Sequence, residues 1–106
     1  MEQHVFSVSE EEKWKLMQIL QNDPYEKESF ASIGYLLRER NSLGLGNVRE
    51  LILYFKAEGE IANKLKEKLR ELKTLKRIEG EEKSKAISAF EAEEMNAAEG
   101  FGSIFG

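Results

Sequence analysis

Two stretches of the chain have the apolar pattern of strands. Residues 4–8 (HVFSV) alternate in side-chain direction, with His4, Phe6 and Val8 on one side. Residues 49–57 (RELILYFKA) form an apolar run with the length of a buried strand. A strand that faces water on one side normally alternates, so an apolar run predicts a sheet that is covered on both faces. We expect the second face to be covered either by the C-terminal helix or by another subunit.

Helical patterns separate and follow these strands. Ser9 followed by Glu12 matches a capping box, which predicts that a helix starts there. This helix should end near Asn22, because a proline two positions later restricts the residue before it to extended conformations. Residues 58–75 and residues 81–99 repeat apolar side chains at helical spacing, which predicts two further helices.

Residues 29–40 (SFASIGYLLRER) support two interpretations. The aromatic and β-branched residues suit a strand. A helix would place Phe30, Ile33 and Leu37 on one side, but Gly34 inside it would cost about 1 kcal/mol relative to alanine. We favour the strand, because a loop with two glycines would join it to the next strand as a hairpin.

With a short strand at 75–80, the expected order is strand, helix, strand, strand, helix, strand and a final helix. This order predicts an α+β domain of the ferredoxin-like (βαββαβ) type, with an antiparallel sheet and an extra C-terminal helix. The alternative is a mostly α protein with a short N-terminal strand, which would resemble a ribbon-helix-helix DNA-binding dimer. Strand 4–8 carries no Arg, Lys, Asn or Gln for reading base edges, which disfavours this alternative.

The composition is typical of a small globular protein with a strongly charged surface. Of the 106 residues, 41% are apolar and 34% are charged. A surface rich in Glu and Lys is common in heat-adapted proteins. The chain has no cysteine, and we find neither a signal peptide nor an apolar run long enough to span a membrane. We therefore expect a cytoplasmic protein without a membrane partner.

Charge is distributed unevenly along the chain. The net charge is −4 over residues 1–60, +4 over residues 61–85 and −4 over residues 86–106. An overall negative charge disfavours tight non-specific binding of nucleic acid. However, four basic residues recur at 4-3-4 spacing along and just past the predicted helix 58–75, and we call them the basic stripe: Lys66, Arg70, Lys73 and Arg77. RNA or DNA binding through this stripe, with Tyr54 or Phe55 stacking on bases, is our alternative function.

Patterns that indicate catalysis or metal binding are weak. His4 is the only histidine, and we expect it at the surface of a strand near the terminus. The carboxylates Glu91, Glu93 and Glu94 suit a hard cation, but on a helix Glu91 and Glu94 are neighbours while Glu93 points elsewhere. We expect an ordinary solvated helix face there, and neither enzyme activity nor a metal or cofactor. Proteins of this topology also bind small molecules at helix–strand edges, although no motif here names a ligand.

The last seven residues combine glycines with apolar side chains. Gly100 predicts the end of the last helix, so we expect a domain at 1–99 and a Gly/Phe-rich tail at 100–106. The tail carries Phe101, Ile104 and Phe105, which would complete the protein's own core, dock onto a second copy or another protein, or remain disordered. We expect a small protein-interaction or regulatory module that associates through its apolar sheet face and this tail.

Overall fold

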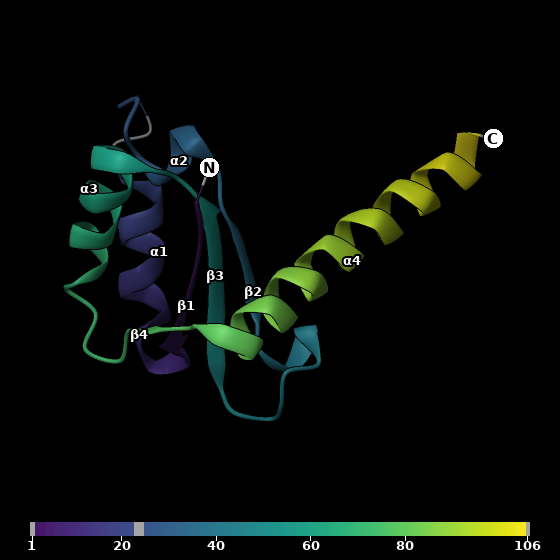
Figure 1. The fold of residues 1–106 in the computed structure, drawn as a ribbon, viewed down its shortest axis with the longest axis horizontal. Helices are drawn as coiled ribbons and strands as arrows, with labels where there is room; N and C mark the ends of the chain where they lie inside the picture. Colours follow the sequence, from purple (N-terminus) through teal and green to yellow (C-terminus); the bar gives the residue numbers. More distant parts are fainter. Residues whose placement is uncertain (1, 23–24, 106) are drawn as a thin grey trace.

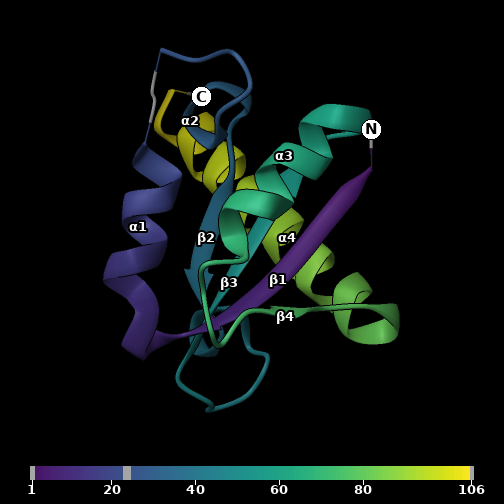
Figure 2. The ribbon, with the colours of Figure 1, turned by 90° about the vertical axis from the view of Figure 1, so that its left-hand side faces the viewer.

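The computed structural model describes residues 2–22 and 25–105, with side chains described up to Glu94. These residues form one antiparallel sheet of four strands, with helices on both faces (Figures 1 and 2). The elements are β1 Gln3–Ser9, α1 Lys13–Gln21, α2 Phe30–Ile33, β2 Leu36–Glu39, β3 Glu50–Lys56, α3 Gly59–Leu69, β4 Lys76–Arg77 and α4 Gly80–Phe105, with 3-10 turns η1 Glu10–Glu12 and η2 Asn41–Leu43. The predicted α+β class is confirmed, and the mostly α alternative is wrong.

The sheet is built around β1 and β3, which lie in the middle of the order β2-β3-β1-β4. These two strands pair over seven positions, from Gln3 opposite Lys56 to Ser9 opposite Glu50. The predicted strands at 4–8 and 49–57 are therefore confirmed. All five residues from Leu51 to Phe55 are buried, which is the two-sided burial that their apolar sequence predicts.

Successive side chains of these strands enter two separate cores, because side chains of a strand alternate between its faces. The core on one face includes α1 and α3 and is formed mainly by Phe6, Val8, Leu16, Leu20, Leu51, Leu53, Phe55, Leu65 and Leu69. The core on the other face includes α4 and is formed by Val5, Ile52, Tyr54, Ile78, Ala86 and Phe90. Figure 2 shows the sheet with α3 on the near side and α4 on the far side.

Helix α4 covers the second face of the sheet with its N-terminal half. Ala86 and Phe90 are buried, and the ring of Phe90 lies 5.5 Å from the ring of Tyr54 between centroids. Of the two coverings that the sequence left open for this face, the C-terminal helix is the one found. Both Tyr54 and Phe55 are buried, so the prediction that one of them is exposed to stack on bases is wrong.

Residues 29–40 form neither one continuous strand nor one continuous helix. Ser29 caps the short helix α2, and its hydroxyl accepts a hydrogen bond from the backbone N–H of Ser32 at 3.2 Å. Gly34 then adopts φ = 86°, a conformation that residues with a side chain rarely adopt. The chain turns there and enters β2 at Leu36. Both interpretations are thus correct for part of the segment, and Gly34 separates the two parts.

The carboxylate of Glu12 does not complete the predicted capping box. Ser9 does cap the first turn, where its hydroxyl accepts from the N–H of Glu11. Glu12 instead accepts from the backbone N–H groups of Lys73 and Thr74, at 3.0 and 2.7 Å. These two donors are satisfied outside a helix, so residues 73 and 74 lie beyond α3, which ends at Leu69 rather than near residue 75.

Helix α4 continues past the position where the sequence predicts its end. Its backbone is helical from Gly80 to Phe105, so the predicted stop at Gly100 is wrong. A glycine inside a helix costs only about 1 kcal/mol relative to alanine, and no proline follows to end the helix. The division into a domain at 1–99 and a tail at 100–106 stays a prediction.

No helix in the described part of the chain is both long and apolar enough to cross a membrane.

Replacing Phe90 with alanine should test how α4 is held on the sheet. Phe90 is almost fully buried, so we expect Phe90→Ala to lower the free energy of unfolding by about 3–5 kcal/mol. Urea denaturation followed by circular dichroism measures the change. Ser88→Ala, at an exposed position of the same helix, should change it by less than about 0.5 kcal/mol. A loss below about 1 kcal/mol for Phe90→Ala would contradict the packing described here.

Candidate functional site

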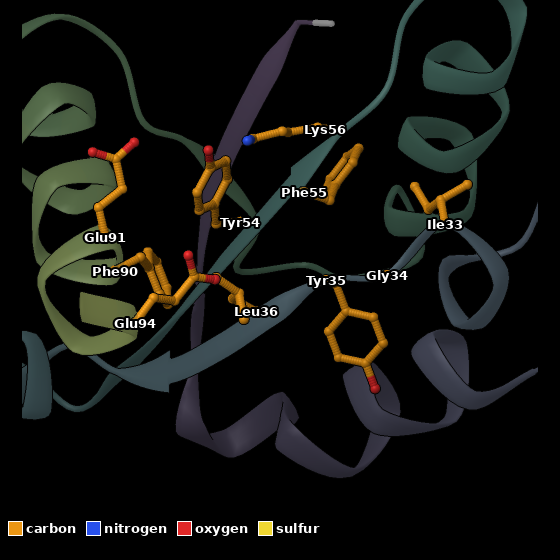
Figure 3. Close-up of a pocket in the computed structure, with 10 residues that line it drawn as sticks. All are labelled: Ile33, Gly34, Tyr35, Leu36, Tyr54, Phe55, Lys56, Phe90, Glu91 and Glu94. Atoms are coloured by element: carbon orange, nitrogen blue, oxygen red, sulfur yellow. The ribbon is translucent and has the colours of Figure 1, made fainter. Parts of the chain in front are cut away.

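A pocket of about 380 Å³ lies where α4 passes the start of β2 and the end of β3 (Figure 3). We call it the α4 pocket, and its main lining residues are Leu36, Tyr54, Lys56, Phe90, Glu91 and Glu94. Gly34 also lines it and has nothing within 4 Å of the place where a side chain would begin. The turn that splits residues 29–40 therefore leaves this corner of the sheet open.

The two walls of the α4 pocket carry opposite charges. Glu91 and Glu94 come from α4, and Lys56 comes from the end of β3 beside Tyr54 (Figure 3). The Tyr54 hydroxyl accepts a hydrogen bond from the side-chain amide of Gln3 at 2.9 Å. The pocket thus combines apolar and aromatic surface with charged groups of both signs, as small-molecule sites do.

The three candidate carboxylates separate as helical spacing predicts. Glu91 and Glu94 line the α4 pocket together, whereas Glu93 pairs with Arg38 on β2 at 2.9 Å. Within the described residues, no cluster of three His, Asp or Glu side chains is arranged to hold a metal ion. Glu91 and Glu94 therefore share one wall of the α4 pocket, and Glu93 does not.

His4 is buried, so the expectation of a surface histidine is wrong. Its side of β1 faces the core with α1 and α3, and only 3% of its surface is exposed. Its ring lies 5.1 Å from that of Phe55, and its Nε2 donates to the carbonyl of Ala57 at 2.9 Å. A carbonyl only accepts, so Nε2 carries the proton of the neutral ring. Burial is the main cause that lowers the pKa of His4, and the nearby cations Lys66 and Arg77 lower it further.

The basic stripe does not lie along one helix. Lys66 is on α3, Arg70 is the residue that ends α3, Lys73 is in the following turn, and Arg77 is on β4. Arg70 pairs with Glu67 at 3.1 Å, and Arg77 pairs with Glu79. Lys66 and Arg77 both lie near His4, because β4 pairs with β1 and α3 packs on the same strand. The four cations therefore come from a helix, its end, a turn and a strand, and two of them pair with glutamates.

Two exposed side chains, Lys56 and Trp14, were not predicted from the sequence. Lys56 is the last residue of β3, and no sequence motif marks it as a binding residue. Its place beside the α4 pocket follows only from the fold. Trp14 is 82% exposed at the start of α1, although its position in an apolar helical pattern suggests burial. The tail residues Phe101, Ile104 and Phe105 fall outside the residues whose side chains are described.

Comparisons with known proteins found no relative of this chain. No protein-family profile matches the chain, and neither the curated proteins nor the solved structures contain a match.

The buried His4 predicts a stability that falls in mild acid. Its pKa is lower in the folded protein than its ordinary value of 6.5, so below pH 6.5 the unfolded chain binds a proton more readily than the folded chain. We expect the melting temperature to fall between pH 7.5 and 5.5, and His4→Gln to reduce this fall while keeping a donor for the Ala57 carbonyl. Thermal melts at the two pH values measure it. An equal pH dependence in both proteins would rule out His4 as its source.

Proposed function

We propose that the protein is a small, non-enzymatic association module that forms a homodimer through the part of α4 beyond the sheet. The observation that carries this proposal is the length of α4. The helix has 26 residues, or about 39 Å at 1.5 Å per residue, and its distal half extends away from the sheet (Figure 1). Its described buried contacts, Ala86 and Phe90, lie in the first half.

The spacing of apolar residues supports a contact along this distal half. With 3.6 residues per turn, positions 97, 101, 104 and 105 fall on the side of the helix that Ala86 and Phe90 present to the sheet. The sequence places Ala97, Phe101, Ile104 and Phe105 there. Short helical segments are marginal alone in water, so a partner that covers this side would stabilise the extension.

A second copy is the partner that we favour. The distal segment after Glu94 contains a single charged residue, Glu99, so it offers little for a strongly charged partner to recognise. Two copies of one apolar helix side are self-complementary in a two-fold dimer. The apolar sheet face itself is a weaker candidate, since Val5, Ile52 and Tyr54 are buried under α4.

We also propose that the domain belongs to the ferredoxin-like type. The observed strand order β2-β3-β1-β4 and the antiparallel pairing of every neighbouring pair support this assignment. The short helix α2 and the long α4 are the additions to that pattern. A cytoplasmic location also stays a prediction.

Light scattering coupled to size exclusion tests the dimer directly. We expect a molar mass of twice the 12.2 kDa chain for the unchanged protein. Substituting serine for Phe101, Ile104 and Phe105 together should give a monomer that melts as an independent fold. Ala92→Glu with Ser103→Glu, on the opposite side of the same helix, is the matched control and should remain a dimer.

Three outcomes would overturn the proposal. A monomer at every concentration tested excludes self-association. A monomer whose melting temperature falls sharply in the triple serine variant indicates that the tail completes the protein's own core. A mass that rises only when a single-stranded oligonucleotide is added, and not in Lys66→Glu with Arg70→Glu, would favour the nucleic-acid alternative.

A further inference from the structure

Three charged side chains meet at the α4 pocket without forming an ion pair among the described residues: Lys56, Glu91 and Glu94. Two arginines on the same side of the molecule are paired with glutamates. Arg38 binds Glu93, and Arg40 binds both Glu50 and Glu82, at 2.9, 2.9 and 2.7 Å. Lys56 on β3 and the two glutamates on α4 instead line the same pocket from different elements, and Figure 3 shows Tyr54 between them.

The surface between these charges is apolar and aromatic. Phe90 and Tyr54 are in contact and form the floor with Leu36, a half-buried residue of β2. The volume of about 380 Å³ lies at the small end of the range for ligand sites, about 300–1,000 Å³. A ligand that fits both features is small and has an apolar body with a charge at each side.

The Tyr54 hydroxyl completes the side of the pocket near Lys56. Its oxygen accepts the hydrogen bond from Gln3, so its own hydrogen is free to be donated. A hydroxyl donor beside an ammonium group is suited to bind a carboxylate, since hydrogen bonds to a charged group are stronger than neutral ones. Across the pocket, Glu91 and Glu94 are suited to bind an ammonium group.

We propose that the α4 pocket binds a zwitterionic molecule of the size of a free amino acid with an apolar side chain. Its ammonium group lies between Glu91 and Glu94, its carboxylate meets Lys56 and the Tyr54 hydroxyl, and its apolar part packs on Leu36 and Phe90. A ligand with one charge would leave one wall of the pocket without a partner. This inference goes beyond the proposed dimer and does not depend on it.

Isothermal titration with a matched ligand set tests the assignment. L-Leucine carries both charges, its methyl ester lacks the carboxylate, and N-acetyl-L-leucine lacks the ammonium group. We expect L-leucine or L-phenylalanine to bind, and the ester and the N-acetyl derivative of the binder to bind about tenfold more weakly.

Two variants test which protein groups bind each charge of the ligand. In Lys56→Gln, the preference for the free amino acid over its ester should fall several-fold, because the carboxylate has lost its cation and keeps only the Tyr54 hydroxyl. In Glu91→Gln with Glu94→Gln, the free amino acid and its N-acetyl derivative should bind equally. Lys85→Gln, at an exposed position of α4 outside the pocket, is the matched control and should bind as the unchanged protein does.

The variants change exposed residues, and unchanged circular dichroism would show that each still folds. Absence of binding by both amino acids at millimolar concentration would overturn the proposal. So would an ester or N-acetyl derivative that binds as tightly as the free amino acid, because the pocket would then recognise only one charge. Molar mass measured on the same samples keeps this result separate from that of the dimer.

Discussion

The two-sided burial of β3 is the constraint on which the rest of the structure depends. Leu51, Leu53 and Phe55 need apolar cover on one face, and Ile52 and Tyr54 need it on the other. At about 25 cal/mol for each Å² of apolar surface removed from water, leaving either set exposed would remove a large part of the stability of so small a domain. Helices α1 and α3 cover the first face, so α4 must cross the second.

The crossing of α4 also explains why a pocket forms at one corner. The helix covers Ile52 and Tyr54 near its own start and then passes the start of β2, where Gly34 contributes no side chain. Charged residues occur in α4 and β3 at this corner because both elements meet water there. The same geometry that completes the core thus leaves opposite charges of α4 and β3 lining one pocket.

Local patterns predicted the elements that local forces decide. The alternation of 4–8 and the apolar run of 49–57 identified β1 and β3. These residues are buried whichever element packs on them, so their own sequence is enough to predict the strand. The hydrogen bonds of Glu12 could not be predicted from local sequence, because the backbone N–H groups that donate to it, at Lys73 and Thr74, are more than sixty residues away. The prediction for His4 was wrong for the same reason: its neighbours are Phe55 on β3 and the carbonyl of Ala57 just after β3, both about fifty residues away in the sequence. The α4 pocket depends on three elements, so no single segment revealed it.

Glu94 divides the apolar side of α4 into two parts. Before Glu94 this side packs on the sheet through Ala86 and Phe90, and after it the apolar positions continue without described contacts. The α4 pocket is located at this change. A ligand held by Glu91 and Glu94 would bind α4 to β3 at the base of the proposed dimer contact. If both sites are occupied as we propose, thermodynamic linkage requires that any effect of the ligand on dimer affinity be matched by an equal effect of dimerisation on ligand affinity.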